Sequence, residues 1–146
     1  NADYIVNFIG KSNIREFIEN PAESINDSLA GVISLLGAVR ESKIKKIVIM
    51  TSWEVYGNKA GNIVYETDNL NPENIYASMN AAIENISRGY YKSYGVPVIS
   101  VRSCNVFGPC QTTDKIVPKI ITNLLGGKKV VIFGEGSDVR SYIYVD

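Results

Sequence analysis

The sequence predicts an α/β fold, part of an open, doubly wound parallel sheet, on three observations. β-branched apolar runs alternate with stretches of helical apolar spacing along the 146 residues. The connections between successive runs are long enough for the crossover helices that parallel strands require. Polar and glycine residues gather where the apolar runs end, and in such sheets ligands bind at the carboxyl ends of the strands.

The expected elements follow in chain order. We expect strands at residues 3–10, 45–52 and 96–105, and helices at 20–42, 76–95 and 114–127. The first long helix has Pro near its start and apolar residues at helical spacing, and Gly95 is placed to end the second. A polar loop is expected from the second strand to about Asn74. Two further extended segments are expected at 128–136 and 139–145.

Composition limits the candidate functions. The chain has fifteen basic and fifteen acidic residues, so its formal net charge of zero gives no electrostatic reason to expect a nucleic-acid partner. The apolar runs are shorter than the ~20 residues of a membrane-spanning helix, so no membrane partner is expected. Two cysteines and no histidine support neither a zinc site nor a disulfide framework. We therefore expect a reduced, cytoplasmic protein.

The absence of histidine also excludes Ser-His-Asp and Cys-His catalysis. Acid–base chemistry would have to use Tyr, Lys, Asp, Glu or Cys. The first residue is not Met, and the last residues, "YIYVD", fall within a strand-like pattern. We expect the chain to be part of a longer polypeptide.

Four features in order carry a family resemblance. Ser52 lies just past a strand in "TSWEVYG", Tyr76 opens a helix in "YASMN", "CNVFGP" closes the next strand, and "GEGSDVRSYIYVD" ends the chain. Together they resemble the extended short-chain dehydrogenase/reductase family, specifically the NAD-dependent nucleotide-sugar epimerases and dehydratases. The second half of the chain is most similar to dTDP-glucose 4,6-dehydratases.

The resemblance implies a catalytic set of Ser52, Glu54 and Tyr76 with NAD as cofactor. Ser52 would hydrogen-bond the sugar oxygen, and Tyr76 would exchange a proton with the sugar C4 hydroxyl. Because a free Tyr has a pKa near ~10, a base at neutral pH needs nearby cations. The family usually has Lys one helical turn after the Tyr, whereas this chain has Asn80, which can hydrogen-bond a cofactor ribose but carries no charge.

The resemblance also shows a departure beside Glu54. The dehydratases typically have Thr-Asp-Glu before "VYG", where the Asp is the acid and the Glu the base for eliminating water. This chain has Ser52, Trp53 and Glu54, so the acid is replaced by a side chain without a usable proton. An epimerase, a decarboxylase or an impaired enzyme becomes a more plausible interpretation than a dehydratase.

The remaining expected site residues come from both halves of the chain. The resemblance places Gly10 with Asn80 at the cofactor, and Asn105, Lys115 and Arg140 at the substrate. Arg140 has the guanidinium geometry that binds phosphate oxygens. No G-x-G-x-x-G turn follows a strand here, so the cofactor's phosphate-binding turn is expected upstream of residue 1. Residues 1–146 are thus expected to be the C-terminal part of an NAD(P)-binding Rossmann domain, running into the substrate-binding region from about residue 109.

Two functional hypotheses remain open at this point. The first is a nucleotide-sugar epimerase or dehydratase that transfers a hydride transiently at sugar C4. The second is a binding or scaffold protein that has kept the fold and nucleotide contacts but lost the charge at position 80. The resemblance also implies a homodimer through the helices at 20–39 and 76–94, although core packing explains their small and aromatic residues equally well.

Overall fold

The computed structural model describes residues 2–59, 62–131, 135–136 and 139–146 of the chain. They belong to two compact units, Asn1–Ser103 and Cys104–Asp146. The division falls directly after the third strand of the main sheet. Among the described residues, no helix is long and apolar enough to cross a membrane.

The first unit contains a parallel three-stranded sheet. Its strands are β1 (Tyr4–Asn7), β2 (Lys46–Ser52) and β3 (Val98–Ser103), in the order β1-β2-β3. The register pairs Asn7 with Ile49, and Ser52 with Ser103. The carboxyl ends of β2 and β3 therefore lie side by side. The predicted α/β class with a parallel sheet is confirmed.

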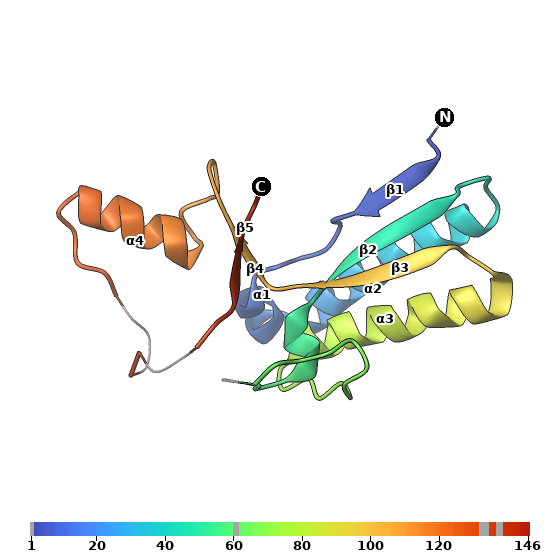
Figure 1. Cartoon of the computed structure of the whole chain (residues 1–146), viewed down its shortest axis with the longest axis horizontal. Helices are drawn as coiled ribbons and strands as arrows, with labels where there is room; N and C mark the ends of the chain where they lie inside the picture. The colour runs from blue at the N-terminus through green and yellow to red at the C-terminus, as the bar shows by residue number, and fades with distance from the viewer. Residues whose placement is uncertain (1, 60–61, 132–134, 137–138) are drawn as a thin grey trace. The chain divides into compact units, whose positions relative to one another are not determined.

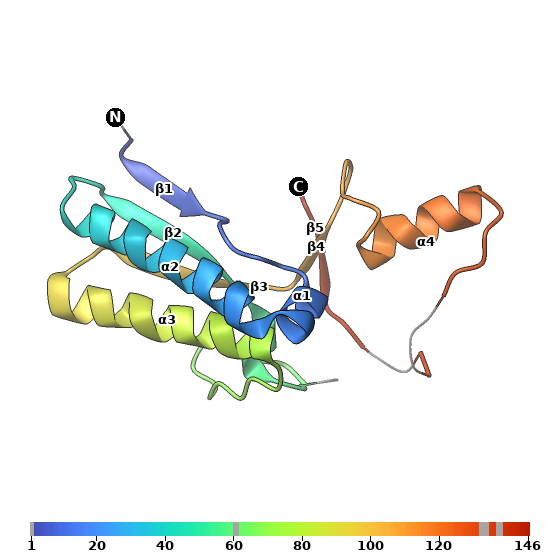
Figure 2. The ribbon, with the colours of Figure 1, turned by 180° about the vertical axis from the view of Figure 1, so that it is seen from behind.

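Three helices of this unit lie on one face of the sheet (Figures 1 and 2). They are α1 (Ile14–Glu19), α2 (Pro21–Arg40) and α3 (Ile75–Tyr94). Their apolar stripes and the inward residues of β2 form one core, because alternate residues of a strand point to the same face. The members of this core include Phe17, Val32, Leu36, Ile47, Ile49, Met79 and Ile83.

Local sequence signals explain the ends of α2 and α3. Pro21 occupies the first turn of α2, where the missing N–H costs nothing. The N-cap of α3 is Asn74, whose side chain accepts a hydrogen bond from the Ala77 N–H. Gly95 ends α3 in the left-handed conformation that glycine adopts most easily. A short 3₁₀-helix, η1 (Trp53–Tyr56), follows β2 directly.

The second unit contains one helix and one strand pair. Strands β4 (Asn105–Phe107) and β5 (Tyr142–Tyr144) are parallel, and α4 spans Ile116–Leu125. Phe107 packs edge-on against Tyr142 and Tyr144 across the pair. Gly108 lies so close to Val145 that an added Cβ would be 2.4 Å from a Val145 methyl carbon.

Several predicted boundaries were wrong. The first strand ends at Asn7, because the buried Asn7 side chain accepts the Ile9 N–H at 3.1 Å and turns the chain before Gly10. The third strand ends at Ser103, and Asn105 begins a separate strand. The described residues 128–131 form no strand, and residues 132–134 of that predicted segment lie outside the described residues. Helix α1 was not predicted, because its six residues are too few to show a clear period.

Candidate active site

The carboxyl end of β2 turns directly into the candidate site. Ser52 is the last residue of β2 and is buried. Its Oγ accepts a hydrogen bond from the Glu54 N–H at 3.2 Å, so Ser52 caps η1. This turn carries Glu54 away from the sheet and toward the start of α3.

Tyr76 lies in the first turn of α3, facing Ser52 and Glu54. Its ring packs edge-on against Phe17 of α1, with 5.4 Å between ring centroids. Burial is the largest effect on the Tyr76 hydroxyl and raises its pKa above the ordinary value. The negative charge of Glu54 raises this pKa further, whereas hydrogen bonds with Ser52 and Asn80 lower it. The structure thus brings Ser52, Glu54, Tyr76 and Asn80 together, although they span 29 positions of the sequence.

Asn80 lies one helical turn after Tyr76 and is buried. Its Nδ2 donates a hydrogen bond to the Tyr76 carbonyl oxygen at 2.9 Å. The amide can approach the phenol but supplies no positive charge there. The balance of effects in this cluster keeps Tyr76 protonated at neutral pH.

Glu54 is held by Asn74, which was not among the predicted site residues. The Asn74 Nδ2 donates a hydrogen bond to Glu54 Oε2 at 3.0 Å. The signal available in the sequence was the position of Asn74 as the polar residue before the helix. That position predicts a cap, but it does not reveal a contact 20 residues away.

A buried charge network lies beside the candidate site and was also missed. Arg102 of β3 binds Glu84 of α3, with Nη2 at 2.7 Å from Oε2 and Nε at 3.0 Å from both carboxylate oxygens. The Thr51 hydroxyl donates to Glu84 at 2.8 Å, and Arg102 Nη1 donates to the Tyr56 hydroxyl at 2.6 Å. The Glu84 carboxylate raises the pKa of Arg102 above its ordinary value. The network therefore ties β2, β3, α3 and η1 together.

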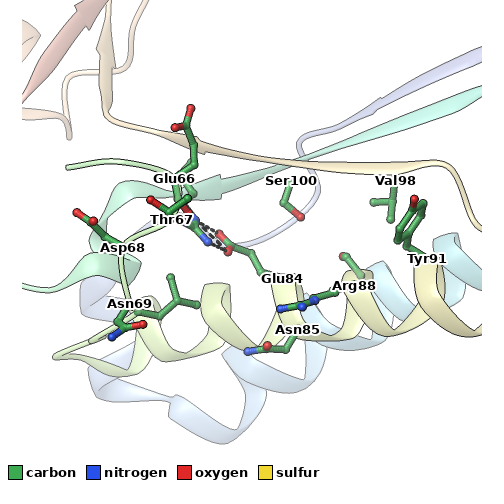
Figure 3. Close-up of a pocket in the computed structure, with 13 residues that line it drawn as sticks. Glu66, Thr67, Asp68, Asn69, Glu84, Asn85, Arg88, Tyr91, Val98 and Ser100 are labelled. Atoms are coloured by element: carbon green, nitrogen blue, oxygen red, sulfur yellow. Dashed lines mark hydrogen bonds and ion pairs between the residues drawn. The ribbon is translucent and has the colours of Figure 1, made fainter.

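The same charge pair borders a cavity of about 600 Å³ (Figure 3). Glu66, Asp68 and Arg88 bring both signs of charge to its lining. The buried Ser87 hydroxyl also borders it and has no hydrogen-bond partner. Ser52, Glu54 and Tyr76 are absent from this lining, so the cavity is separate from the predicted catalytic residues.

The predicted substrate residues all lie in the second unit. Asn105 holds β4 against the segment before β5. Its backbone N–H and its Nδ2 both donate to the Ser141 carbonyl oxygen, at 3.2 and 3.3 Å. Lys115 is the N-cap residue of α4, and its Nζ lies 3.9 Å from an Asp114 carboxylate oxygen. Arg140 lies in the exposed segment before β5. Asn105 and Lys115 thus both have contact partners within the second unit.

The family model described as "NAD dependent epimerase/dehydratase family" matches residues 1–146. The chain belongs to the NAD-dependent epimerase/dehydratase family. The resemblance inferred from the four motifs is confirmed, and NAD is the cofactor of this family.

Three relatives illustrate the range within this family. The low-salt glycan biosynthesis protein Agl12 of Haloferax volcanii is 32% identical over 145 residues, which cover 99% of this chain and 47% of that protein. The structure of the dTDP-glucose 4,6-dehydratase DesIV of Streptomyces venezuelae was solved with NAD and TYD bound. It is 30% identical to this chain, with a TM-score of 0.91, and the match covers 97% of this chain and 44% of the DesIV chain. The structure of the UDP-N-acetylglucosamine 4-epimerase of Methanobrevibacter ruminantium is 28% identical, with a TM-score of 0.90. The match covers 98% of this chain and 47% of the epimerase chain. The chain thus spans less than half of each relative.

The residues at the end of β1 and on α3 fit one part of the family's cofactor. The buried Ser28 hydroxyl has no hydrogen-bond partner, and a Cβ built on Gly10 would lie 3.9 Å from it. Gly10 has a φ of 143°, which favours glycine, and it has no side chain to cover its backbone. The unpartnered Ser28 hydroxyl beside Gly10, together with the buried Asn80 amide on α3, suits a ribose and nicotinamide. The glycine turn that would hold the pyrophosphate is not among these residues.

Proposed function

We propose that the protein carrying this chain is an NAD-dependent epimerase or dehydratase that acts at C4 of a nucleotide sugar. The observation that carries the proposal is the cluster of Ser52, Glu54 and Tyr76 at the carboxyl end of β2, beside the buried Asn80. Ligands of doubly wound sheets bind at this edge. The family membership of the whole chain supports the same assignment.

In this mechanism NAD, when bound, supplies reversible hydride transfer with the sugar C4. Ser52 hydrogen-bonds the C4 oxygen, and the Tyr76 phenolate takes the proton of the C4 hydroxyl as general base. Proton removal requires an ionised phenol, whereas burial and Glu54 both favour the neutral form. The charge that offsets them in the family pattern is missing, because position 80 is Asn. Turnover near neutral pH is therefore expected to be slow.

The side chains beside Ser52 favour epimerisation over dehydration. Glu54 can accept a proton, but the Trp53 indole nitrogen is a donor that does not give up its proton at working pH. Elimination of water needs an acid for the departing hydroxyl, and no acidic side chain occupies position 53. We therefore favour exchange of configuration at C4, with Glu54 assisting Tyr76.

The second half of the chain is proposed to bind the nucleotide. Asn105, Lys115 and Arg140 offer amide, ammonium and guanidinium donors suited to a diphosphate. DesIV was solved with TYD, and the Methanobrevibacter epimerase is named for a UDP-sugar. A dTDP- or UDP-sugar is accordingly the proposed substrate class, and a cytoplasmic homodimer the proposed form of the protein.

A nucleotide or dinucleotide binding protein is the second candidate. The uncharged Asn80 and the raised pKa of Tyr76 favour it, because both reduce the ability of this site to remove a proton.

The distinguishing experiment incubates the complete, NAD-loaded protein with UDP-, dTDP- and GDP-sugars and identifies the products by NMR. Inversion at C4 supports the epimerase, and a 4-keto-6-deoxy sugar would instead show dehydration. Binding of a nucleotide sugar without any product, at pH values up to 10, would establish the second candidate. The Tyr76→Phe variant is the control for contaminating activity.

A further inference from the structure

Asn74 makes two hydrogen bonds that join α3 to Glu54. Its Oδ1 accepts the Ala77 N–H at 2.8 Å, and its Nδ2 donates to Glu54 Oε2 at 3.0 Å. We propose that Asn74 is a positioning residue, which caps α3 and at the same time fixes the Glu54 carboxylate beside Tyr76. Its importance for catalysis rests on the proposed function, whereas the positioning itself does not.

The chemistry of the two bonds explains why this cap is Asn. Ser, Thr, Asp and Asn all cap helices through a side-chain oxygen. Of these, only Asn combines that acceptor with an NH₂ group on the same rigid plane, so both bonds can form together. Asp would present a second carboxylate to Glu54. Ser and Thr keep the cap, but their side chains are shorter and lack the amide donor.

Glu54 is restrained through its side chain by the Asn74 amide. It lies in a single 3₁₀ turn, and its backbone rather than its side chain is bound by Ser52. Asn74 precedes Tyr76 by only two residues. A bond from Asn74 to Glu54 therefore places the carboxylate relative to the start of the same helix that carries the phenol.

The Tyr76 pKa reports where the Glu54 carboxylate lies. Of the groups that act on the phenol, Glu54 is the charged one, while Ser52 and Asn80 are neutral and Phe17 contributes an apolar ring. Glu54 disfavours the phenolate, so releasing its carboxylate toward water should lower the Tyr76 pKa. A shift of about half a unit corresponds to moving one charge a few ångströms away at high effective dielectric.

The experiment titrates tyrosinate absorbance of the complete protein and subtracts the curve of the matching Tyr76→Phe variant. Asn74→Ser and Asn74→Thr, which both keep the cap, are expected to lower the Tyr76 pKa by about half a unit. In a Glu54→Gln background the same substitutions should change nothing, because the charge they would displace is gone. Asn13→Ser is the control: Asn13 caps α1 in the same way, through Oδ1 and the Arg15 N–H at 3.1 Å, and this variant should titrate like the native protein.

Two results would overturn the proposal. One is an unchanged Tyr76 pKa in both cap-keeping variants. The other is an equal shift with and without the Glu54 charge, which would mean that Asn74 acts through the helix alone. In turnover assays, Asn74→Ser should shift the pH–rate profile toward acid by about the same half unit while KM stays near native. Unaltered turnover in Tyr76→Phe would contradict the proposed function, yet a charge-dependent shift in the titration would still establish the role of Asn74.

Discussion

At the scale of single residues, Tyr76 and Asn80 show how an uncharged side chain at one position affects the chemistry of the candidate site. The phenol lies against Ser52 and the Asn80 amide, which are both neutral, while burial and the Glu54 charge raise its pKa. The fold therefore places the hydroxyl beside Ser52 and Asn80 without lowering its pKa. Supplying a cation at position 80 therefore tests whether Tyr76 is the base.

Asn80→Lys in the complete protein tests this directly. A cation a few ångströms from the phenol favours phenolate by roughly 1 to 4 kcal/mol, or about one to three pKa units. The Tyr76 pKa, measured from tyrosinate absorbance, should fall by that amount. Asn80→Gln is the control, since it keeps an amide and should leave the pKa near the native value. An unchanged pKa in Asn80→Lys would show that the ammonium does not reach the phenol.

Two glycines at positive φ should respond differently to Ala. Gly57 has φ 74° and ψ −161°, a region open almost only to glycine, and an added Cβ would be 2.3 Å from the Asn71 carbonyl oxygen. Gly95 has φ 70° and ψ 17°, and an added Cβ would meet no atom within 4 Å. Gly95→Ala should therefore cost about 1 kcal/mol of unfolding free energy, and Gly57→Ala clearly more. Urea unfolding of the two variants gives the comparison, and equal losses would contradict it.

At the scale of elements, the Arg102–Glu84 pair joins β3 to α3. Glu84 is 8% exposed, so Arg102→Ala would leave a buried carboxylate that accepts a hydrogen bond from the neutral Thr51 hydroxyl. We expect a loss of about 3–5 kcal/mol of unfolding free energy in urea. The exposed pair Arg15–Glu19 is the control, and Arg15→Ala should cost less than about 1 kcal/mol. Similar losses in the two variants would show that the buried pair does not have the role we assign to it.

The elements also show what the sequence could and could not predict. Long helices and the central strand were predicted because a sustained apolar period reflects burial. Gly95 and Pro21 marked helix ends through backbone preferences that are local in sequence. The Asn7 turn and the six-residue α1 depend on contacts formed only in the folded chain.

At the candidate site, too, only the residues with a local sequence pattern could be predicted. Ser52 and Tyr76 were found from motif spacing, and the structure brings them together with Glu54 and Asn80. Asn74 and Arg102 act through partners 20 and 18 positions away, at Glu54 and Glu84. No local pattern encodes such pairings, because the fold alone decides which polar groups meet.

At the scale of the whole molecule, the three-stranded sheet has one face covered by its own helices and one face largely exposed. Alternate residues on the second face are apolar, with Tyr4 67%, Val6 56%, Ile99 42% and Val101 37% exposed. Parallel sheets normally have both faces covered. The chain spans 47% of the length of one curated relative and 36% of another.

The 146-residue chain expressed by itself is expected not to retain NAD. The residues suited to the ribose and nicotinamide are present, but the glycine turn that would bind the pyrophosphate is not among them. The check is cofactor content after purification, from absorbance and mass spectrometry of the heat-released supernatant. Stoichiometric NAD in the purified chain would contradict this expectation.

The central claim is that Tyr76 removes the proton of a nucleotide-sugar C4 hydroxyl. It is tested most directly by the pH dependence of sugar conversion by the complete protein, measured for the native enzyme and for Tyr76→Phe. Because the Tyr76 pKa is raised, the native rate should be low near neutral pH and increase into alkali, and Tyr76→Phe should show no conversion at any pH. Conversion by Tyr76→Phe at the native rate and with the native pH profile would contradict the account.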